Sequence, residues 1–307
     1  MKDKQTKFDA AFRVASQLIS EVACLGMAIL ICSSASAQNL FMSDGFSGIA
    51  HDLGHIYKIG PDGVPKTIAS GLNGPLGLAV DSTGNLFVAS GGGVILKFTP
   101  NGTHSTFAIG LNQVGGVAFD SAGNLFAADG GSILEFTPNG AQTIFASGFG
   151  RTNGLAFDGT GNLFVTDWGS GNVDKITASG MRSTFASGLS SPFDLAFDSA
   201  GNLFVTDWGV CCSGSGGHIY KFTPDGTQST FAQLAAPEGL VFDSADNLFV
   251  VDENTGNIFK FTPAGVRSIF AKAVGFSMDE VAFLAFSLTP GPIPAAIRRH
   301  RHRHHHN

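Results

Sequence analysis

The stretch that decides the fold spans residues 154–188 and reads GLAFDGTGNLFVTDWGSGNVDKITASGMRSTFASG. It contains four short runs rich in Phe, Val, Ile and Thr, and each run ends at a cluster of Gly, Asp, Asn or Ser. Runs of this length and composition, bounded by turn-forming residues, are typical of β-strands joined by tight turns. None of the runs is long enough for an ordinary helix. The stretch therefore predicts a four-stranded antiparallel meander.

The same pattern recurs along the chain, most visibly in the second run, where Asn-Leu-Phe appears six times. The repeated phenylalanines are separated by 46, 39, 38, 40 and 45 residues. They are Phe41, Phe87, Phe126, Phe164, Phe204 and Phe249. A four-stranded unit with a period of about 40 residues is typical of a β-propeller blade. The sequence thus predicts an all-β fold, a six-bladed β-propeller.

Only five of the six units contain a first strand of their own, because the repeats begin directly at a second strand. The missing strand is predicted at residues 278–287, MDEVAFLAFS, which have the right composition and no following turn. One strand from the C-terminal end would complete blade one with three strands from the N-terminal end. A ring closed in this way leaves no sheet edge open between the first and last blades. We expect the propeller to be a monomer.

Composition supports a folded body and excludes one class of partner. Of the 307 residues, 14% are charged and 28 are Phe, which argues against disorder. Residues 38–290 contain 10 Lys and Arg against 21 Asp and Glu. A body this acidic repels phosphate backbones, so we expect no nucleic-acid partner.

The two ends differ from the repeats. Residues 1–37 combine a basic start, an apolar run at 22–32 and small residues at 35–37, which is typical of a secretory signal peptide. The apolar run is short for a bilayer span, so none is predicted in the mature chain, with a retained anchor as the alternative. We therefore expect a secreted or periplasmic protein. The propeller is predicted over residues 38–290, and a basic His/Arg-rich disordered tail over 291–307.

Loop lengths indicate which face of the propeller binds. The connections between first and second strands and between third and fourth strands are short and stereotyped, whereas the loops on the other face vary. The loops at 44–54 and 207–217 are the long ones. Since binding residues usually lie on variable loops of a rigid scaffold, we predict the ligand-binding face there. Its candidate residues are Trp168, Trp208, Cys211 and Cys212.

Each candidate on this face has two interpretations. Each Trp follows an Asp, and it either stacks on a flat ligand or packs between blades while the Asp ties the turn. The adjacent cysteines either form a strained disulfide that stiffens the loop or remain two thiols. No Gly-x-Ser-x-Gly elbow is present, and the histidines of the body lack zinc-ligand spacing, so a serine hydrolase and a zinc hydrolase are both disfavoured.

The repeat resembles the NHL repeat, in which Val-Ala-Val-Asp, a turn and Gly-Asn-Ile-Tyr-Val-Ala-Asp precede an Asn and an Ile. Segments such as GLAFDGTGNLFVTD at 154–167 carry this resemblance, which extends over residues 39–287. NHL propellers include protein-binding modules, sugar- or lactone-handling relatives and a few lyases. The resemblance implies the fold more firmly than the function, because one fold hosts many functions.

The blades are also similar to the SMP-30/gluconolactonase group, whose members bind a divalent metal with an acid, an Asn and an Asp at the start of first strands. Asn153 matches the Asn-Gly-Leu pattern of that group, and Asp279 matches its first-blade acid. Blade five departs from the pattern, because Phe193 takes the position and Asp194 comes one residue later. Glu238 offers an acid one blade further on. Because Asn153, Asp194, Glu238 and Asp279 all precede or begin first strands, together they predict an oxygen-only site of the kind suited to Ca²⁺ or Mg²⁺.

Two functions follow from these observations. The first is an exported module that binds an unidentified small molecule or protein through its variable face, since no complete catalytic constellation is visible. The alternative is a metal-dependent lactone hydrolase of the SMP-30/gluconolactonase type, in which the metal polarises a carbonyl or activates water. The alternative to a metal site is that these four residues only cap turns and bind water at the mouth of the channel.

Overall fold

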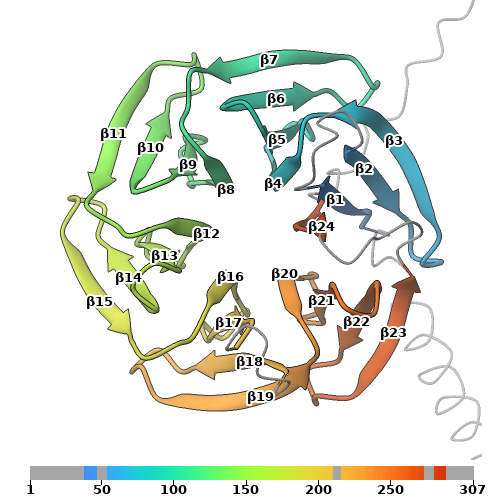
Figure 1. Ribbon diagram of the computed structural model, residues 1–307, viewed down its shortest axis with the longest axis vertical. Coiled ribbons are helices and arrows are strands. Elements are labelled where there is room, and N and C mark those ends of the chain that lie inside the picture. The colour runs from blue at the N-terminus through green and yellow to red at the C-terminus, as the bar shows by residue number, and fades with distance from the viewer. Residues whose placement is uncertain (1–37, 47–53, 210–215, 273–279, 288–307) are drawn as a thin grey trace, which may run out of the picture. The chain divides into compact units, whose positions relative to one another are not determined.

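The computed structural model of the protein describes residues 38–46, 54–209, 216–272 and 280–287. Within these ranges all regular secondary structure consists of β-strands. The strands form six sheets placed like blades around a central axis (Figure 1). The predicted all-β, six-bladed propeller is therefore confirmed. The predicted signal peptide and basic tail lie outside the described residues and stay predictions.

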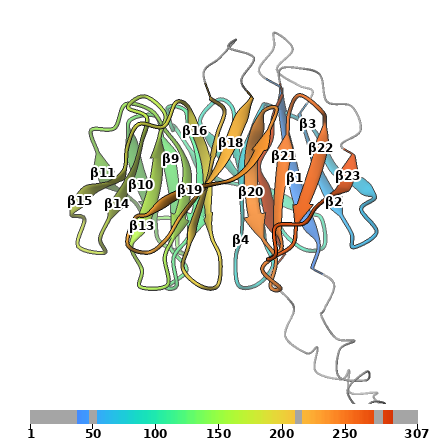
Figure 2. The ribbon, with the colours of Figure 1, turned by 90° about the horizontal axis from the view of Figure 1, so that it is seen from below.

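Blades two to six each consist of four consecutive antiparallel strands, with the first strand at the axis and the fourth at the rim (Figures 1 and 2). Blade two contains β4 (Pro75–Val80), β5 (Leu86–Ser90), β6 (Val94–Phe98) and β7 (His104–Ile109). Blade three contains β8 (Val114–Phe119), β9 (Leu125–Asp129), β10 (Ser132–Phe136) and β11 (Gln142–Ser147). Blade four contains β12 (Thr152–Phe157), β13 (Leu163–Asp167), β14 (Asn172–Ile176) and β15 (Arg182–Ala186). Blade five contains β16 (Pro192–Phe197), β17 (Leu203–Asp207), β18 (Gly217–Phe222) and β19 (Gln228–Leu234). Blade six contains β20 (Pro237–Phe242), β21 (Leu248–Asp252), β22 (Asn257–Phe261) and β23 (Arg267–Lys272).

Blade one joins the two ends of the repeat region. It contains β1 (Leu40–Phe46), β2 (Gly54–Ile59) and β3 (Pro65–Leu72), together with β24 (Glu280–Val281) and β25 (Leu284–Phe286). Both β24 and β25 pair antiparallel with β1. The Ser287 N–H donates to the Asn39 carbonyl at 2.8 Å, and the Ser43 N–H donates to the Phe283 carbonyl at 3.1 Å. The predicted closure by a C-terminal first strand is confirmed.

The register of the closing strand corrects the position predicted for Asp279. The triplet Leu284-Ala285-Phe286 pairs with β1 as Leu155-Ala156-Phe157 pairs with β13. The prediction instead aligned the triplet at 281–283, three residues earlier. In the observed register Ala282 takes the position of Asn153, and Asp279 itself lies outside the described residues.

Phenylalanine contacts between blades explain this register. In each of five blade junctions, a second-strand Phe meets the first-strand Phe of the next blade edge to face. The pairs are Phe87–Phe119, Phe126–Phe157, Phe164–Phe197, Phe204–Phe242 and Phe249–Phe286, with ring centroids 4.9–5.1 Å apart. Such pairs contribute about 0.5–1.5 kcal/mol beyond the area that they bury. Only the observed register gives Phe286 the place that this repeated contact requires.

Candidate functional site

Aspartates at the ends of second strands fix the loops of the variable face. In blade four, Asp167 accepts hydrogen bonds from the N–H groups of Gly150 and Arg151, at 2.9 and 2.8 Å. Asp207 does the same for Ser190 and Ser191 in blade five, at 2.9 and 2.7 Å. Each carboxylate thus connects the loop that leads into a first strand to the end of the second strand in the same blade. The interpretation that these aspartates tie turns agrees with the structure.

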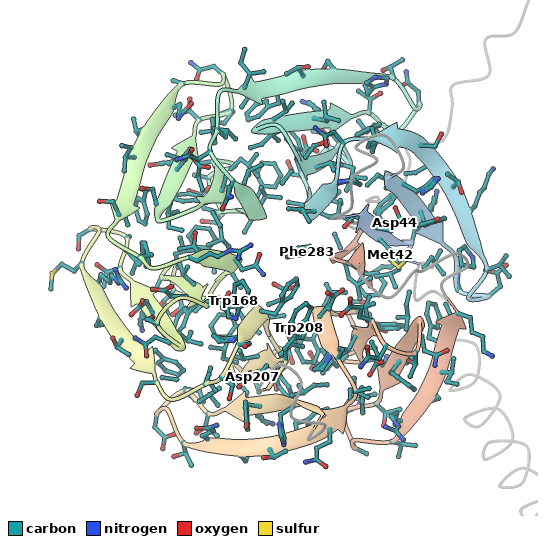
Figure 3. The ribbon with its side chains drawn as sticks, in the orientation of Figure 1. Met42, Asp44, Trp168, Asp207, Trp208 and Phe283 are labelled. Atoms are coloured by element: carbon teal, nitrogen blue, oxygen red, sulfur yellow. The ribbon has the colours of Figure 1, made fainter. Side chains whose placement is uncertain are left out.

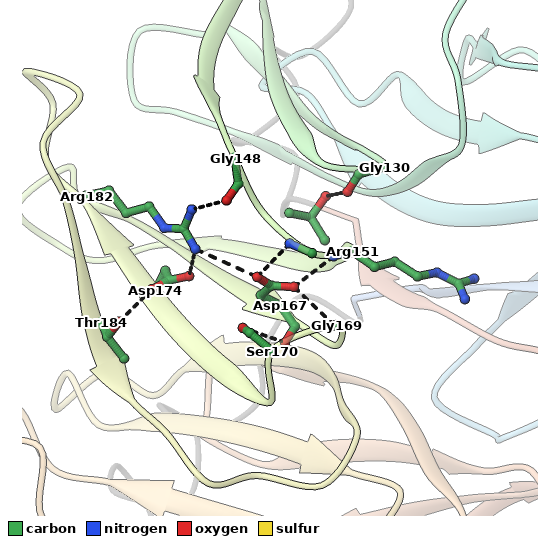
Figure 4. A network of polar contacts seen from close by, with 11 residues as sticks. Gly130, Gly148, Arg151, Asp167, Gly169, Ser170, Asp174, Arg182 and Thr184 are labelled. Atoms are coloured by element: carbon green, nitrogen blue, oxygen red, sulfur yellow. Dashed lines mark hydrogen bonds and ion pairs between the residues drawn. The ribbon is translucent and has the colours of Figure 1, made fainter.

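The Asp167 carboxyl group is at the centre of a wider polar network in blade four (Figure 4). Burial by itself would raise the pKa of Asp167, but hydrogen bonds from Arg151 and Gly150 and the charge of Arg182 bring this pKa below its usual value. Arg182 lies 3.7 Å from Asp167 and 2.6 Å from the buried Asp174. An ionised, strongly bonded carboxylate holds the loop rigidly at neutral pH.

The two tryptophans have different surroundings, although the same strand sequence precedes each. Trp168 is 39% exposed, and the guanidinium of Arg151 lies 4.5 Å from the centre of its ring. The Trp208 ring stacks on Phe193, with centroids 5.6 Å apart and an interplanar angle of 11°. Trp208 therefore packs within the structure, whereas Trp168 and Arg151 form an exposed pair. Figure 3 shows Trp168 and Trp208 on neighbouring blades near the axis.

Aromatic side chains meet at the axis itself. Phe193 packs against Phe283 with ring centroids 5.2 Å apart, so that it connects blade five to blade one across the ring. Figure 3 shows Phe283 pointing inward from the closing strand. Sequence reasoning did not find this contact, because it depends on the observed register of the closing strand. The other predicted residues of this face, Cys211 and Cys212, lie outside the described residues.

The acids proposed as metal ligands form hydrogen bonds with the backbone of neighbouring first strands. Asp194 is 7% exposed and accepts from the N–H of Leu240 in the next blade at 3.1 Å. Glu238 is fully buried and accepts from the N–H of Ala282, again one blade on, at 2.6 Å. Its other oxygen, Oε1, has no hydrogen-bond partner among the described residues. The two carboxyl groups thus link blades five, six and one around the axis.

Burial also changes the ionisation of these acids. It raises the pKa of Asp194 to about 7, against hydrogen bonds from Leu240 and Leu195 that lower it. Burial likewise raises the pKa of Glu238 well above its usual range, against a hydrogen bond from Ala282. A carboxyl group with a raised pKa binds a divalent cation less readily, because it must first lose its proton.

Three of the four predicted metal ligands, Asn153, Asp194 and Glu238, belong to the described residues. Within them, no three or more His, Cys, Asp or Glu side chains are placed to hold a metal ion. Asn153 lies on β12, next to the strand that carries Asp194, and its Oδ1 faces Gly115 of the preceding blade. Calcium or magnesium binding by these residues stays a prediction.

A third cluster lies in blade one, and sequence reasoning missed it. Asp44 is 5% exposed and accepts a hydrogen bond from the Tyr57 hydroxyl at 3.0 Å. It also accepts a hydrogen bond from the His55 backbone N–H, and the Nδ1 atom of His55 lies 3.2 Å away. Burial raises the pKa of Asp44 despite these contacts. The recurring Gly-His-Ile-Tyr-Lys of residues 54–58 and 217–221 was the available signal, because both copies follow the long loops.

A cavity of about 910 Å³ lies at the axis. First strands of all six blades line it, mostly through Leu, Ala, Val and Phe side chains. It extends to the turns at 81–85 and 120–123, which join first and second strands. It therefore lies toward the face opposite to the variable loops.

These features define the class as a six-bladed β-propeller with variable loops anchored by aspartates. No known sequence family and no curated protein matches the chain. Solved structures do resemble it. A chain in a nidogen/laminin complex aligns with a TM-score of 0.68 and 18% identity, over 81% of this protein and 99% of that chain. A catalytically inactive virginiamycin B lyase from Staphylococcus aureus, with quinupristin, aligns with a TM-score of 0.59 and 13% identity, over 81% and 99%.

A gluconolactonase from Xanthomonas campestris aligns as well, with a TM-score of 0.59 and 17% identity, over 76% of this protein and 86% of that chain. Structural neighbours thus include lyases and a gluconolactonase as well as a chain from a nidogen/laminin complex. Identities this low establish the shared fold alone. Among the described residues there is no helix with the length and apolar character needed to cross a bilayer.

Proposed function

We propose that this protein is an exported propeller of the NHL type that binds a protein partner through its variable-loop face. The observation that carries the proposal is the exposed pair of Trp168, which Figure 3 labels, and Arg151, which Figure 4 labels. Export rests on the composition of residues 1–37. The relationship to NHL repeats and to the SMP-30/gluconolactonase group rests on the repeat pattern and agrees with the solved neighbours.

The Trp168–Arg151 pair has the properties of a binding hot spot. Trp and Arg are the residues that most often dominate interface energies, especially where they are held rigidly. Here the backbone of Arg151 donates to Asp167, and the Gly169 N–H donates to the same carboxylate at 3.1 Å. Both side chains therefore project from backbone that is fixed before binding, which lowers the entropy lost on association.

The placement of the acids supports the binding proposal. Asp194 and Glu238 are engaged with backbone N–H groups of the next blade rather than grouped around an open position. A catalytic divalent metal needs several ionised or carbonyl oxygens directed at one point. The hydrogen bonds of these carboxyl groups instead connect neighbouring blades.

The test is retention of a partner by the immobilised full chain from the extracytoplasmic fraction of producing cells. Trp168→Ala should weaken binding of the retained protein about 30-fold or more, which corresponds to about 2 kcal/mol. Ile144→Ala is the matched control, because Ile144 is 69% exposed on the outer strand of blade three. Equal retention by both variants and the wild type would contradict the proposal.

The second candidate is the metal-dependent lactone hydrolase. Its support is that Asn153, Asp194 and Glu238 lie on three neighbouring first strands, and that Glu238 Oε1 lacks a partner among the described residues. Hydrolysis of a sugar lactone that a chelator stops and that Asn153→Ala abolishes would establish this function.

A further inference from the structure

The axial cavity has one charged residue in its inner wall. First-strand residues of all six blades contribute to this wall, and among them Asp194 alone carries a charge. Its other first-strand residues are Gly, Ala, Val, Leu and Phe, including Leu155, Leu240 and Phe283. Asp81, Lys97 and Asp120 also line the cavity, but they belong to blades two and three, and Asp81 and Asp120 lie at its turn end. The inner part is therefore an apolar chamber with a single acid.

Asp194 occupies a place where most other blades have no side chain. The equivalent positions hold Gly77, Gly116, Gly154 and Gly239, and in blade one Phe283. A Cβ at Gly154 would lie 2.7 Å from the Asp194 Oδ1 atom, so the absence of a side chain in blade four makes room for the carboxyl group. Gly154 thus leaves space for the Asp194 carboxyl group, which is held at one defined point of the cavity wall.

The hydrogen bonds of Asp194 leave it able to accept more. Oδ1 accepts from the Leu195 N–H at 2.9 Å, and Oδ2 accepts from the Leu240 N–H at 3.1 Å. A carboxylate offers about four acceptor sites, so each oxygen retains one. Among the described residues, no Lys, Arg or His forms an ion pair with it. A buried carboxylate without a cation is unfavourable, and a cationic ligand would relieve that cost.

The ionisable groups near Asp194 limit the charge of such a ligand. On the strands beside β16, the ionisable groups are Asp207 of β17 and Glu238 of β20, together with Asp167 of β13. Asp167 and Asp207 accept hydrogen bonds from loop backbone, and Glu238 is fully buried and accepts one from the Ala282 N–H. Asp194 therefore offers no more than one negative charge to the chamber. One charge in apolar surroundings suits a monovalent cation better than a divalent metal.

We propose that the axial cavity binds an organic monocation, an ammonium group carried on an apolar chain, with the ammonium paired to Asp194 and the chain against the Leu and Phe side chains of the first strands. The site is separate from the Trp168–Arg151 face and does not depend on its function. The ammonium supplies hydrogen-bond donors to the two free acceptor sites, and the apolar chain displaces water from the chamber wall.

Hexylammonium chloride, titrated calorimetrically into the full-length protein, tests the proposal. Hexan-1-ol is the neutral analogue of the same shape. One saturable site is expected for hexylammonium, with hexan-1-ol at least tenfold weaker. Asp194→Asn should weaken hexylammonium binding at least tenfold and leave hexan-1-ol unchanged. Asp62→Asn removes the same charge from an exposed turn of blade one and should change neither. Equal affinities for the two probes, or equal hexylammonium binding by wild type and Asp194→Asn, would overturn the proposal.

Discussion

At the scale of single residues, the first strands show how small side chains set the spacing of the ring. The Cβ of an alanine at Gly77 would lie 2.4 Å from the Gly115 carbonyl oxygen of the next blade. Similar limits apply at the other first-strand glycines, so the blades approach one another closely at the axis. These glycines can be recognised in the sequence, but the close contact that requires them exists only between adjacent blades of the folded ring.

Gly154 allows the most direct test of this spacing. Gly154→Ala would place its Cβ 2.7 Å from both the Cα and Oδ1 atoms of Asp194. We expect a loss of about 1–3 kcal/mol in the free energy of unfolding, because a well-packed centre does not accommodate an added methyl group. Gly159→Ala is the control in the same blade, since nothing lies within 4 Å of its Cβ. Denaturant unfolding that affected both variants alike would contradict this account of the axis.

Asp194 predicts a pH dependence of stability. Its pKa is about 7 in the folded protein and 3.8 in an ordinary environment, so between these values the folded state holds a proton that the unfolded state has lost. The resulting stabilisation is complete below pH 3.8 and is lost as the pH rises through 7. Asp194→Asn has no such dependence. Relative to wild type, the variant should gain about 2–3 kcal/mol between pH 5 and pH 8. Parallel stability curves for the two proteins would show the carboxyl group to be unperturbed.

At the scale of elements, hydroxyl groups of second strands join neighbouring blades. Thr206 Oγ1 accepts from the Asp194 N–H at 3.0 Å and donates to the Glu238 carbonyl of the next blade at 2.7 Å. Thr166 makes the same bridge in blade four and Ser43 in blade one. The corresponding residues of blades two, three and six are apolar. Polar junctions of this kind are thus formed by the second strands of blades one, four and five.

The polar network of blade four predicts that two equivalent arginines contribute differently to stability (Figure 4). The Arg182 guanidinium contacts the buried Asp174 at 2.6 Å and lies 3.8 Å from the centre of the Phe149 ring. Arg182→Met keeps the packing and removes the charge, so we expect a loss of about 2–3 kcal/mol at pH 7. Arg267→Met is the control at the same position of blade six, where the guanidinium lies over Phe259 at 5.2 Å, and it should change stability by less than about 0.5 kcal/mol.

The pH dependence identifies the source of the Arg182 effect. The pKa of Asp167 is lowered in the folded protein, so the stability it contributes is present above pH 3.8 and is lost as the pH falls through its lowered pKa. The loss caused by Arg182→Met should therefore shrink in acid. A loss of the same size at pH 3 and pH 7 would indicate that packing, rather than charge, is responsible.

At the scale of the whole molecule, the repeat period and the count of first strands predicted the fold, including the C-terminal strand that closes blade one. The register of that strand could not be predicted, because Val281-Ala282-Phe283 and Leu284-Ala285-Phe286 both match the first-strand pattern. The contact between Phe286 and Phe249 decides between them, and this contact exists only in the closed ring.

The candidate site was less accessible from sequence than the fold. The tryptophans and the acids at 194 and 238 could be singled out by their positions in the repeat. Arg151 beside Trp168, and the hydrogen bonds from the next blade to Asp194, could not, because these contacts join loops and strands of different units. Repetition predicts what every blade shares, whereas the site is built from what single blades do differently.

Closure of the ring predicts a cooperative loss of stability. A chain that ends before residue 278 lacks both β24 and β25, which exposes the edge of β1 and the cluster around Met42 and Leu284. Thermal unfolding should shift to a lower temperature by about 10 °C or more, since several buried side chains lose their partners at once. A chain that ends at residue 290 keeps the closing strands and serves as the control. An unchanged midpoint in the shorter chain would refute the closure.

Metal content measured together with lactone turnover tests most directly the claim that this propeller binds rather than catalyses. The full-length protein, purified without chelator and exchanged into metal-free buffer, is analysed for calcium and magnesium and then assayed on a sugar lactone. We predict well below one equivalent of either metal, and no hydrolysis that a chelator suppresses. One equivalent of calcium or magnesium, with chelator-sensitive turnover that Asn153→Ala removes, would contradict the account.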